Sequence, residues 1–112
     1  MTASIKVDPG VCGFDVDIKA SAVDSMNVDL EIESNCQTIK EIAQQLKDKT
    51  PIDAYQELSP VAESIILALS RPILIQKGCC EACIVPQAIC KAMYVAAGLA
   101  LPKDVQLKIS KD

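Results

Sequence analysis

The N-terminal third of the chain alternates apolar and polar residues with a period of two, and this pattern restricts the fold more than any other feature of the sequence. The alternation covers residues 3–8, 14–20 and 28–33. Successive side chains of a β-strand point to opposite faces of a sheet, so each run predicts a strand with one apolar face. The polar positions of the third run are acidic: Asp29, Glu31 and Glu33. We therefore predict an antiparallel sheet that is covered on one face and exposes an acidic face to water.

Helical segments are expected after these strands. Residues 34–37 have the spacing of a capping box, and apolar residues at helical intervals follow, which predicts a helix over residues 35–47. A serine–proline pair opens a second helix over residues 60–70. Pro72 is expected to end that helix, because proline has no backbone N–H to donate. The third helix is expected over residues 86–98, with a glycine at its C-terminus.

A last strand is expected near the C-terminus, after Pro102. Val105, Leu107 and Ile109 alternate there with polar residues. The order is then three strands, three helices and one strand, which indicates a two-layer α+β fold, with an antiparallel sheet of about four strands and helices on one face. A chain of 112 residues has room for one hydrophobic core. We therefore expect a single domain over residues 1–112.

The chain contains no histidine, which excludes several kinds of active site. Ser-His-Asp triads, Cys-His pairs and histidine metal ligands all require an imidazole. With two tyrosines, one phenylalanine and the single arginine Arg71, the chain also lacks the stacking and guanidinium groups that nucleic-acid binding uses. No nucleotide-binding or hydrolase motif occurs. We expect no nucleic-acid partner, and we favour a non-catalytic role over an enzymatic one.

Neither a membrane helix nor a signal peptide is predicted. The longest apolar stretch, residues 92–101, is about half of the roughly 20 residues that cross a bilayer. The first residues lack the continuous apolar run of a signal peptide. We therefore expect a cytoplasmic protein that does not bind a membrane. In that reducing compartment, the six cysteines are better explained as metal ligands, redox thiols or core residues than as disulfides.

Cysteines gather at the expected ends of strands and helices. Cys12 falls between the first two strands, Cys36 in the first turn of the first helix, and Cys80 and Cys83 form a C-x-x-C motif before the third helix. Thiolates are preferred ligands of zinc and of iron–sulfur clusters. We predict that Cys12, Cys36, Cys80 and Cys83 converge at one end of the sheet and bind Zn²⁺ or an iron–sulfur cluster, with Cys79 able to replace Cys80.

Cys90 is the exception among the cysteines. It lies within the third predicted helix, beside Ile89, Met93 and Ala97. Free cysteine is often buried and behaves as a small apolar residue. We therefore predict that Cys90 packs in the core and takes no part in the site.

The layout of the cysteines resembles that of iron–sulfur cluster assembly scaffold proteins. Their ligands lie in a turn between strands, at a helix start and just before a C-terminal helix, which implies Cys12, Cys36 and one of residues 79, 80 and 83 here, and a scaffold or carrier role. A second resemblance, over nearly the whole chain, is to a family of short uncharacterised proteins. Its motifs are Cys-Gly-Phe, Ser-x-Cys and Cys-x-x-Cys-x-Val-Pro, here residues 12–14, 34–36 and 80–86.

The sequence also fits two other functions. In the first, Cys80 and Cys83 form a redox-active disulfide with Cys36 as the resolving thiol. In the second, the protein holds no cofactor, its cysteines only pack, and it binds a protein partner through the apolar residues at positions 72–75. A protein partner is therefore expected under more than one hypothesis.

Cys36 is predicted to be the most reactive thiol of the metal-free protein. Backbone N–H groups in the first turn of a helix have no helical acceptor and stabilise a thiolate, which is the form that alkylates. Cys36→Ser should therefore remove the fast phase of iodoacetamide labelling at neutral pH, while Cys90→Ser should leave it in place. Loss of the fast phase in Cys90→Ser alone would contradict the assignments of both residues.

Overall fold

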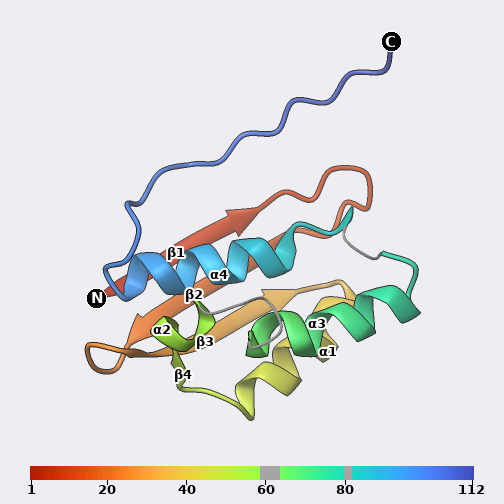
Figure 1. Cartoon of the computed structure of the whole chain (residues 1–112). Helices are drawn as coiled ribbons and strands as arrows, with labels where there is room; N and C mark the ends of the chain where they lie inside the picture. The colour runs from red at the N-terminus through yellow and green to blue at the C-terminus, as the bar shows by residue number, and fades with distance from the viewer. Residues whose placement is uncertain (59–63, 80–81) are drawn as a thin grey trace.

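The fold comes from a computed structural model that describes residues 1–58, 64–79 and 82–112. Within these ranges a four-stranded antiparallel sheet is covered by helices on one face (Figure 1), which confirms the predicted α+β class. The elements, in chain order, are β1 (Thr2–Val7), β2 (Val16–Ala22), β3 (Asn27–Ser34), α1 (Gln37–Lys47), β4 (Ile52–Asp53), α2 (Ala54–Glu57), α3 (Ile65–Gln76) and α4 (Val85–Ala96).

The apolar face of the sheet is the one that the alternation predicts. Ile5 lies opposite Ile18, and Ile18 lies opposite Ile32, so one row of isoleucines crosses β1, β2 and β3. Helix α4 packs on β1 and β2, α1 packs on β3, and α3 lies against both helices (Figure 1). The core therefore forms between the sheet and this helical layer. The helices of the described ranges include none that is long and apolar enough to span a membrane.

The opposite face of the sheet carries polar and charged side chains. Asp17, Asp29, Glu31 and Glu33 are all exposed there, as predicted. Lys6 approaches Asp17 with 3.7 Å between Nζ and Oδ1, and both side chains are mostly exposed. An ion pair in that setting contributes little to stability. Burial on the helix side therefore determines which way each strand faces.

The predicted last strand is wrong. Residues 101–112 form no strand, every side chain in that segment is exposed, and Figure 1 shows the segment leaving the body of the protein. The fourth strand of the sheet is instead β4, which pairs Ile52 with Val28 and Asp53 with Asn27. Alternation identifies a segment with the composition of a strand, but pairing also requires a neighbouring edge. The consequence is an extended C-terminal segment with apolar side chains in water.

Pro72 does not end the second helix, because α3 continues through it to Gln76. Proline removes a single hydrogen bond and crowds the preceding turn. Beyond it, Ile73 and Leu74 are 7% and 2% exposed, so their burial in the core favours continuing the helix. The predicted N-cap at residues 59–60 lies outside the described residues, and α3 begins at Ile65.

Gly78, and not Pro72, marks the end of α3. Gly78 has a φ of +80°, a backbone angle that residues other than glycine rarely adopt. Its N–H donates to the carbonyl of Ile75 at 3.1 Å, and the N–H of Cys79 donates to that of Leu74 at 2.8 Å. These two bonds form a Schellman motif. Gly98, with a φ of +79°, ends α4 in the same way, as the sequence predicts.

The buried carboxylate of Glu57 caps the first turn of α3. Glu57 is 4% exposed, and its oxygens accept hydrogen bonds from the Ser64 hydroxyl and from the backbone N–H groups of Ile65 and Ile66. The Ser64 oxygen in turn accepts from the N–H of Leu67 at 3.1 Å. The first N–H groups of the helix, which have no helical acceptor, are therefore satisfied by these two side chains. This contact joins α2 to α3.

Glu57→Ala should destabilise the protein by about 2–3 kcal/mol, because it leaves buried N–H groups and the Ser64 hydroxyl without their acceptor. The free energy of unfolding from urea titrations measures this. Glu41→Ala, on the exposed face of α1, is the matched control and should change stability by less than about 0.5 kcal/mol. Equal effects for the two variants would contradict the role of Glu57.

Candidate functional site

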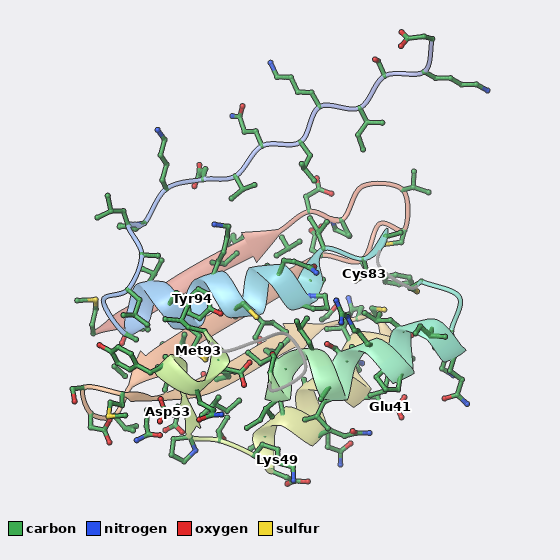
Figure 2. All side chains as sticks on the ribbon, in the orientation of Figure 1. Glu41, Lys49, Asp53, Cys83, Met93 and Tyr94 are labelled. Atoms are coloured by element: carbon green, nitrogen blue, oxygen red, sulfur yellow. The ribbon has the colours of Figure 1, made fainter. Side chains whose placement is uncertain are left out.

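The cysteines described at the ends of elements lie at one end of the sheet. Cys12 is in the β1–β2 connection, Cys36 precedes α1, Cys79 follows α3, and Cys83 precedes α4. Figure 1 shows these connections together, at the end where β1 and β3 finish, and Figure 2 labels Cys83 there. We call these four residues the cysteine end. Cys80, which the sequence places in the same group, lies outside the described residues.

The pKa of the Cys83 thiol depends on its surroundings at this end. Burial raises that pKa, and the thiols of Cys79, Cys12 and Cys36 each raise it further by repulsion. Coulomb repulsion weakens with distance and is screened over about 10 Å in dilute salt, so groups that act on Cys83 lie close to it. The N–H of Val85 acts in the opposite direction, because its hydrogen bond to Cys83 stabilises the thiolate. Chain segments far apart in sequence thus meet around Cys83.

Ser34 positions Cys36. The Ser34 hydroxyl donates to the carbonyl of Asp15 at 2.9 Å and accepts from the N–H of Cys36 at 3.1 Å. Asp15 belongs to the β1–β2 connection, so this serine ties the start of α1 to the segment that carries Cys12. The predicted capping box is therefore wrong in detail, because Cys36 and not Ser34 is the N-cap, and α1 begins at Gln37.

The β1–β2 connection presents Cys12 to solvent. Local hydrogen bonds shape this loop: the N–H of Gly10 donates to the Asp8 side chain and that of Gly13 to the Gly10 carbonyl, both at 3.0 Å. Val11 and Cys12 are exposed at its tip. A loop held by local bonds, with its tip outside the core, opens and shifts at low cost in free energy. Cys12 can therefore approach Cys36 or Cys83 more readily than those residues can approach it.

Helix starts add a favourable field at the cysteine end. The N-caps of α1 and α4, Cys36 and Ile84, make no side-chain capping hydrogen bond. The N-terminus of a helix carries about half a positive charge, which stabilises anions within the first turn. Both helix starts lie at the same end of the sheet (Figure 1). The dipoles of both helices therefore favour negative charge at this end of the sheet.

The thiols are free and are not assembled as a coordination shell. Among the described residues, no group of three or more Cys, Asp or Glu side chains is arranged to hold a metal ion. Cys12, Cys36, Cys79, Cys83 and Cys90 form no disulfide. The predicted ligand set of Cys12, Cys36, Cys80 and Cys83 includes a residue outside the described ranges. It stays a prediction.

The apolar partner surface expected at residues 72–75 is wrong. Ile73 and Leu74 are part of the core, and only Ile75 of these three is exposed, at 61%. Helical periodicity is the reason, since consecutive residues of a helix point to different sides. The sequence does not predict the hydrogen bond from the Ser34 hydroxyl to the Asp15 carbonyl. Residue spacing near a helix start does not show which distant backbone group a serine will contact.

Comparisons with known proteins give one match. A model of a family of unknown function, DUF6951, matches residues 3–109. Searches of curated proteins and of solved structures found no match. The family match agrees with the expected membership of an uncharacterised family, while the resemblance to iron–sulfur cluster assembly scaffold proteins stays a prediction.

Cys90 lies apart from the cysteine end, on α4, where it packs against the core as predicted. Burial, with a smaller contribution from Glu57, raises its pKa from the ordinary value of 9.0 to about 11. Between these values the unfolded chain ionises its thiol and the folded chain does not, so rising pH favours unfolding. The folded protein therefore stabilises the neutral form of the Cys90 thiol.

Between pH 9 and 11 the wild-type protein should lose stability relative to Cys90→Ala, by at most about 2–3 kcal/mol. Urea titrations of both proteins at several pH values measure the difference, and titration of other groups cancels in the comparison. Parallel stability curves over this range would contradict the raised pKa. Below pH 9 the two curves should run parallel.

Proposed function

Because the chain belongs to DUF6951, a family of unknown function, we propose a function from its own residues: it binds Zn²⁺ or an iron–sulfur cluster through thiolates at the cysteine end. The observation that carries the proposal is that Cys12, Cys36, Cys79 and Cys83, which come from different connections, lie at the same end of the sheet (Figure 1). A shared role is the simplest reason for thiols to gather at the ends of elements rather than in the core.

The donor set suits a soft metal ion. Cys12, Cys36 and Cys83 would supply three thiolates, and one residue of the Cys79–Cys80 pair would supply the fourth. Four thiolates form the tetrahedral sites of zinc and the usual ligand set of [2Fe–2S] and [4Fe–4S] clusters. A bound cation would also stabilise the Cys83 thiolate against the burial and the neighbouring thiols that raise its pKa. Binding would therefore release protons and weaken as pH falls.

Coordination would require the cysteine end to contract. Metal–sulfur bonds of about 2.3 Å place tetrahedral sulfurs about 3.8 Å apart. The segment that can move most easily is the β1–β2 loop, where Cys12 is exposed and the hydrogen bonds are local. Ser34, bonded to Asp15 and to the N–H of Cys36, would limit how far the base of that loop shifts. Metal binding would therefore order the Cys12 loop against α1 and α4.

A redox disulfide at the C-x-x-C motif is the less supported alternative. Reactive cysteines of such motifs have a lowered thiol pKa, which supplies the attacking thiolate. The pKa of Cys83 is raised by burial and by its neighbouring thiols. We therefore favour metal binding, in a scaffold or carrier role, within a reducing cytoplasm that keeps the thiols free. A carrier role requires a protein partner that delivers or receives the metal.

The test is elemental analysis and a visible absorption spectrum of the full chain purified without oxygen. Stoichiometric zinc without colour identifies a zinc site, whereas iron with inorganic sulfide and visible absorption identifies a cluster. Cys12→Ser, Cys36→Ser and Cys83→Ser should each lose the metal, and Cys90→Ser should keep it as the matched control. Cys79→Ser and Cys80→Ser, compared with each other, identify the fourth ligand.

Two outcomes would overturn the proposal. The first is metal-free protein that takes up neither Zn²⁺ nor a reconstituted cluster. The second is retention of the metal by both Cys12→Ser and Cys36→Ser, which would confine binding to the 79–83 segment.

A further inference from the structure

The C-terminal segment, residues 104–110, has the pattern of a β-strand but is not paired in this structure. Val105, Leu107 and Ile109 are 61%, 67% and 92% exposed, and polar residues alternate with them. The family model extends to residue 109, so the segment belongs to the part of the chain that the family shares. A strand with one apolar side is stabilised at the edge of a sheet, where its backbone pairs and its apolar side chains are covered.

The outer edge of β1 offers this pairing. Among the described residues, β1 is the first strand in the sheet order and pairs with β2 on one side only. On the helix-facing side of β1, Ala3 and Val7 are buried, whereas Ile5 between them is only half-buried. The apolar residues of the C-terminal segment are spaced in the same way, at every second position. A strand alongside β1 therefore places apolar residues next to apolar residues.

The C-terminal segment starts at the end of the sheet where β1 begins. Figure 1 shows α4 ending beside the N-terminus, and the segment then running in the same direction as β1. Leu99 still packs against the core, and its N–H donates to the carbonyl of Tyr94 at 2.8 Å. The connection from Leu99 to Val105 can extend to about 20 Å, whereas a helix is about 10 Å across. The chain can therefore cross from the helical layer to the sheet.

The connection after α4 is compatible with the turn that this crossing requires. Proline favours the second position of a β-turn because its φ is fixed, and Pro102 holds that position in residues 101–104. Leu101 is 88% exposed, so a change of backbone angles here disrupts no contact with the core. Residues 101–104 can therefore act as a hinge.

We propose that residues 104–110 close onto the free edge of β1 in their own chain, as a further strand parallel to β1. Val105, Leu107 and Ile109 then lie on the helix-facing side, next to Ile5. The polar residues between them face the open side of the sheet, where the charged residues of β2 and β3 are mostly acidic. The added strand ends where β1 ends, beside the loop that carries Cys12.

The short connection favours the chain's own edge over the edge of a second copy. A short flexible linker gives the tethered segment an effective concentration of about millimolar, so a second copy competes only when the protein itself is that concentrated. Closure also covers an edge that would otherwise pair with strands of other chains. The C-terminal segment would therefore protect the edge of its own sheet.

Amide hydrogen exchange of the reduced full chain, followed residue by residue by NMR, tests the proposal. Reductant is required because Cys12 is exposed and would link copies by itself. We expect the 104–110 amides that donate to β1 to exchange at least about 10-fold more slowly than in Leu107→Lys, at every protein concentration. Gln106→Lys adds the same charge one residue away, on the polar side, and should keep the protection.

Sedimentation velocity of the same samples identifies the edge that is used. Protection in a monomer, unchanged by dilution, is the expected result. A dimer whose dissociation removes the protection would overturn the proposal, because the segment would then pair with a second copy. Rapid exchange of the 104–110 amides at every concentration would also overturn it, since the segment would occupy no edge. Equal protection in the wild type and Leu107→Lys would contradict the role of the apolar side.

Discussion

The structure depends on a sheet that is apolar on one face only. Because Asp17, Glu31 and their neighbours occupy the other face, the helices of the described ranges all have to pack on the side of Ile5, Ile18 and Ile32. The chain then passes between two layers, and it can do so only at the ends of the sheet. One of those ends receives the β1–β2 loop, the start of α1, and the connection from α3 to α4 (Figure 1). The cysteines meet because those connections meet.

The pKa of the Cys83 thiol follows from the same arrangement. Burial raises it, and the thiols of Cys79, Cys12 and Cys36 raise it further. The N–H of Val85 acts in the opposite direction, because its hydrogen bond stabilises the Cys83 thiolate. The proposed binding of a cation would stabilise the Cys83 thiolate and release its proton.

Much of the fold could be predicted from the sequence, because burial on one face imposes the period of each element. The three long strands and the Gly98 end of α4 follow that rule. The errors arose where tertiary contacts decide: Pro72 stays helical because Ile73 and Leu74 are buried, and the C-terminal segment forms no strand because alternation alone does not dock it on an edge of the sheet. For the site, the sequence correctly predicts that Cys12, Cys36 and Cys83 lie at the ends of strands and helices. Their separations depend on loop conformations that spacing does not encode.

X-ray absorption at the edge of the metal that the purified protein carries is the most direct test of the thiolate site. The account predicts a first shell made of sulfur, at about 2.3 Å if the metal is zinc. Substituting Cys36 should reduce the sulfur contribution or abolish binding, because its thiolate would be one of the ligands, placed at the start of α1 where its N–H donates to the Ser34 hydroxyl. A first shell of oxygen and nitrogen at about 2.0–2.1 Å would contradict the account, since the metal would then be bound away from the thiols.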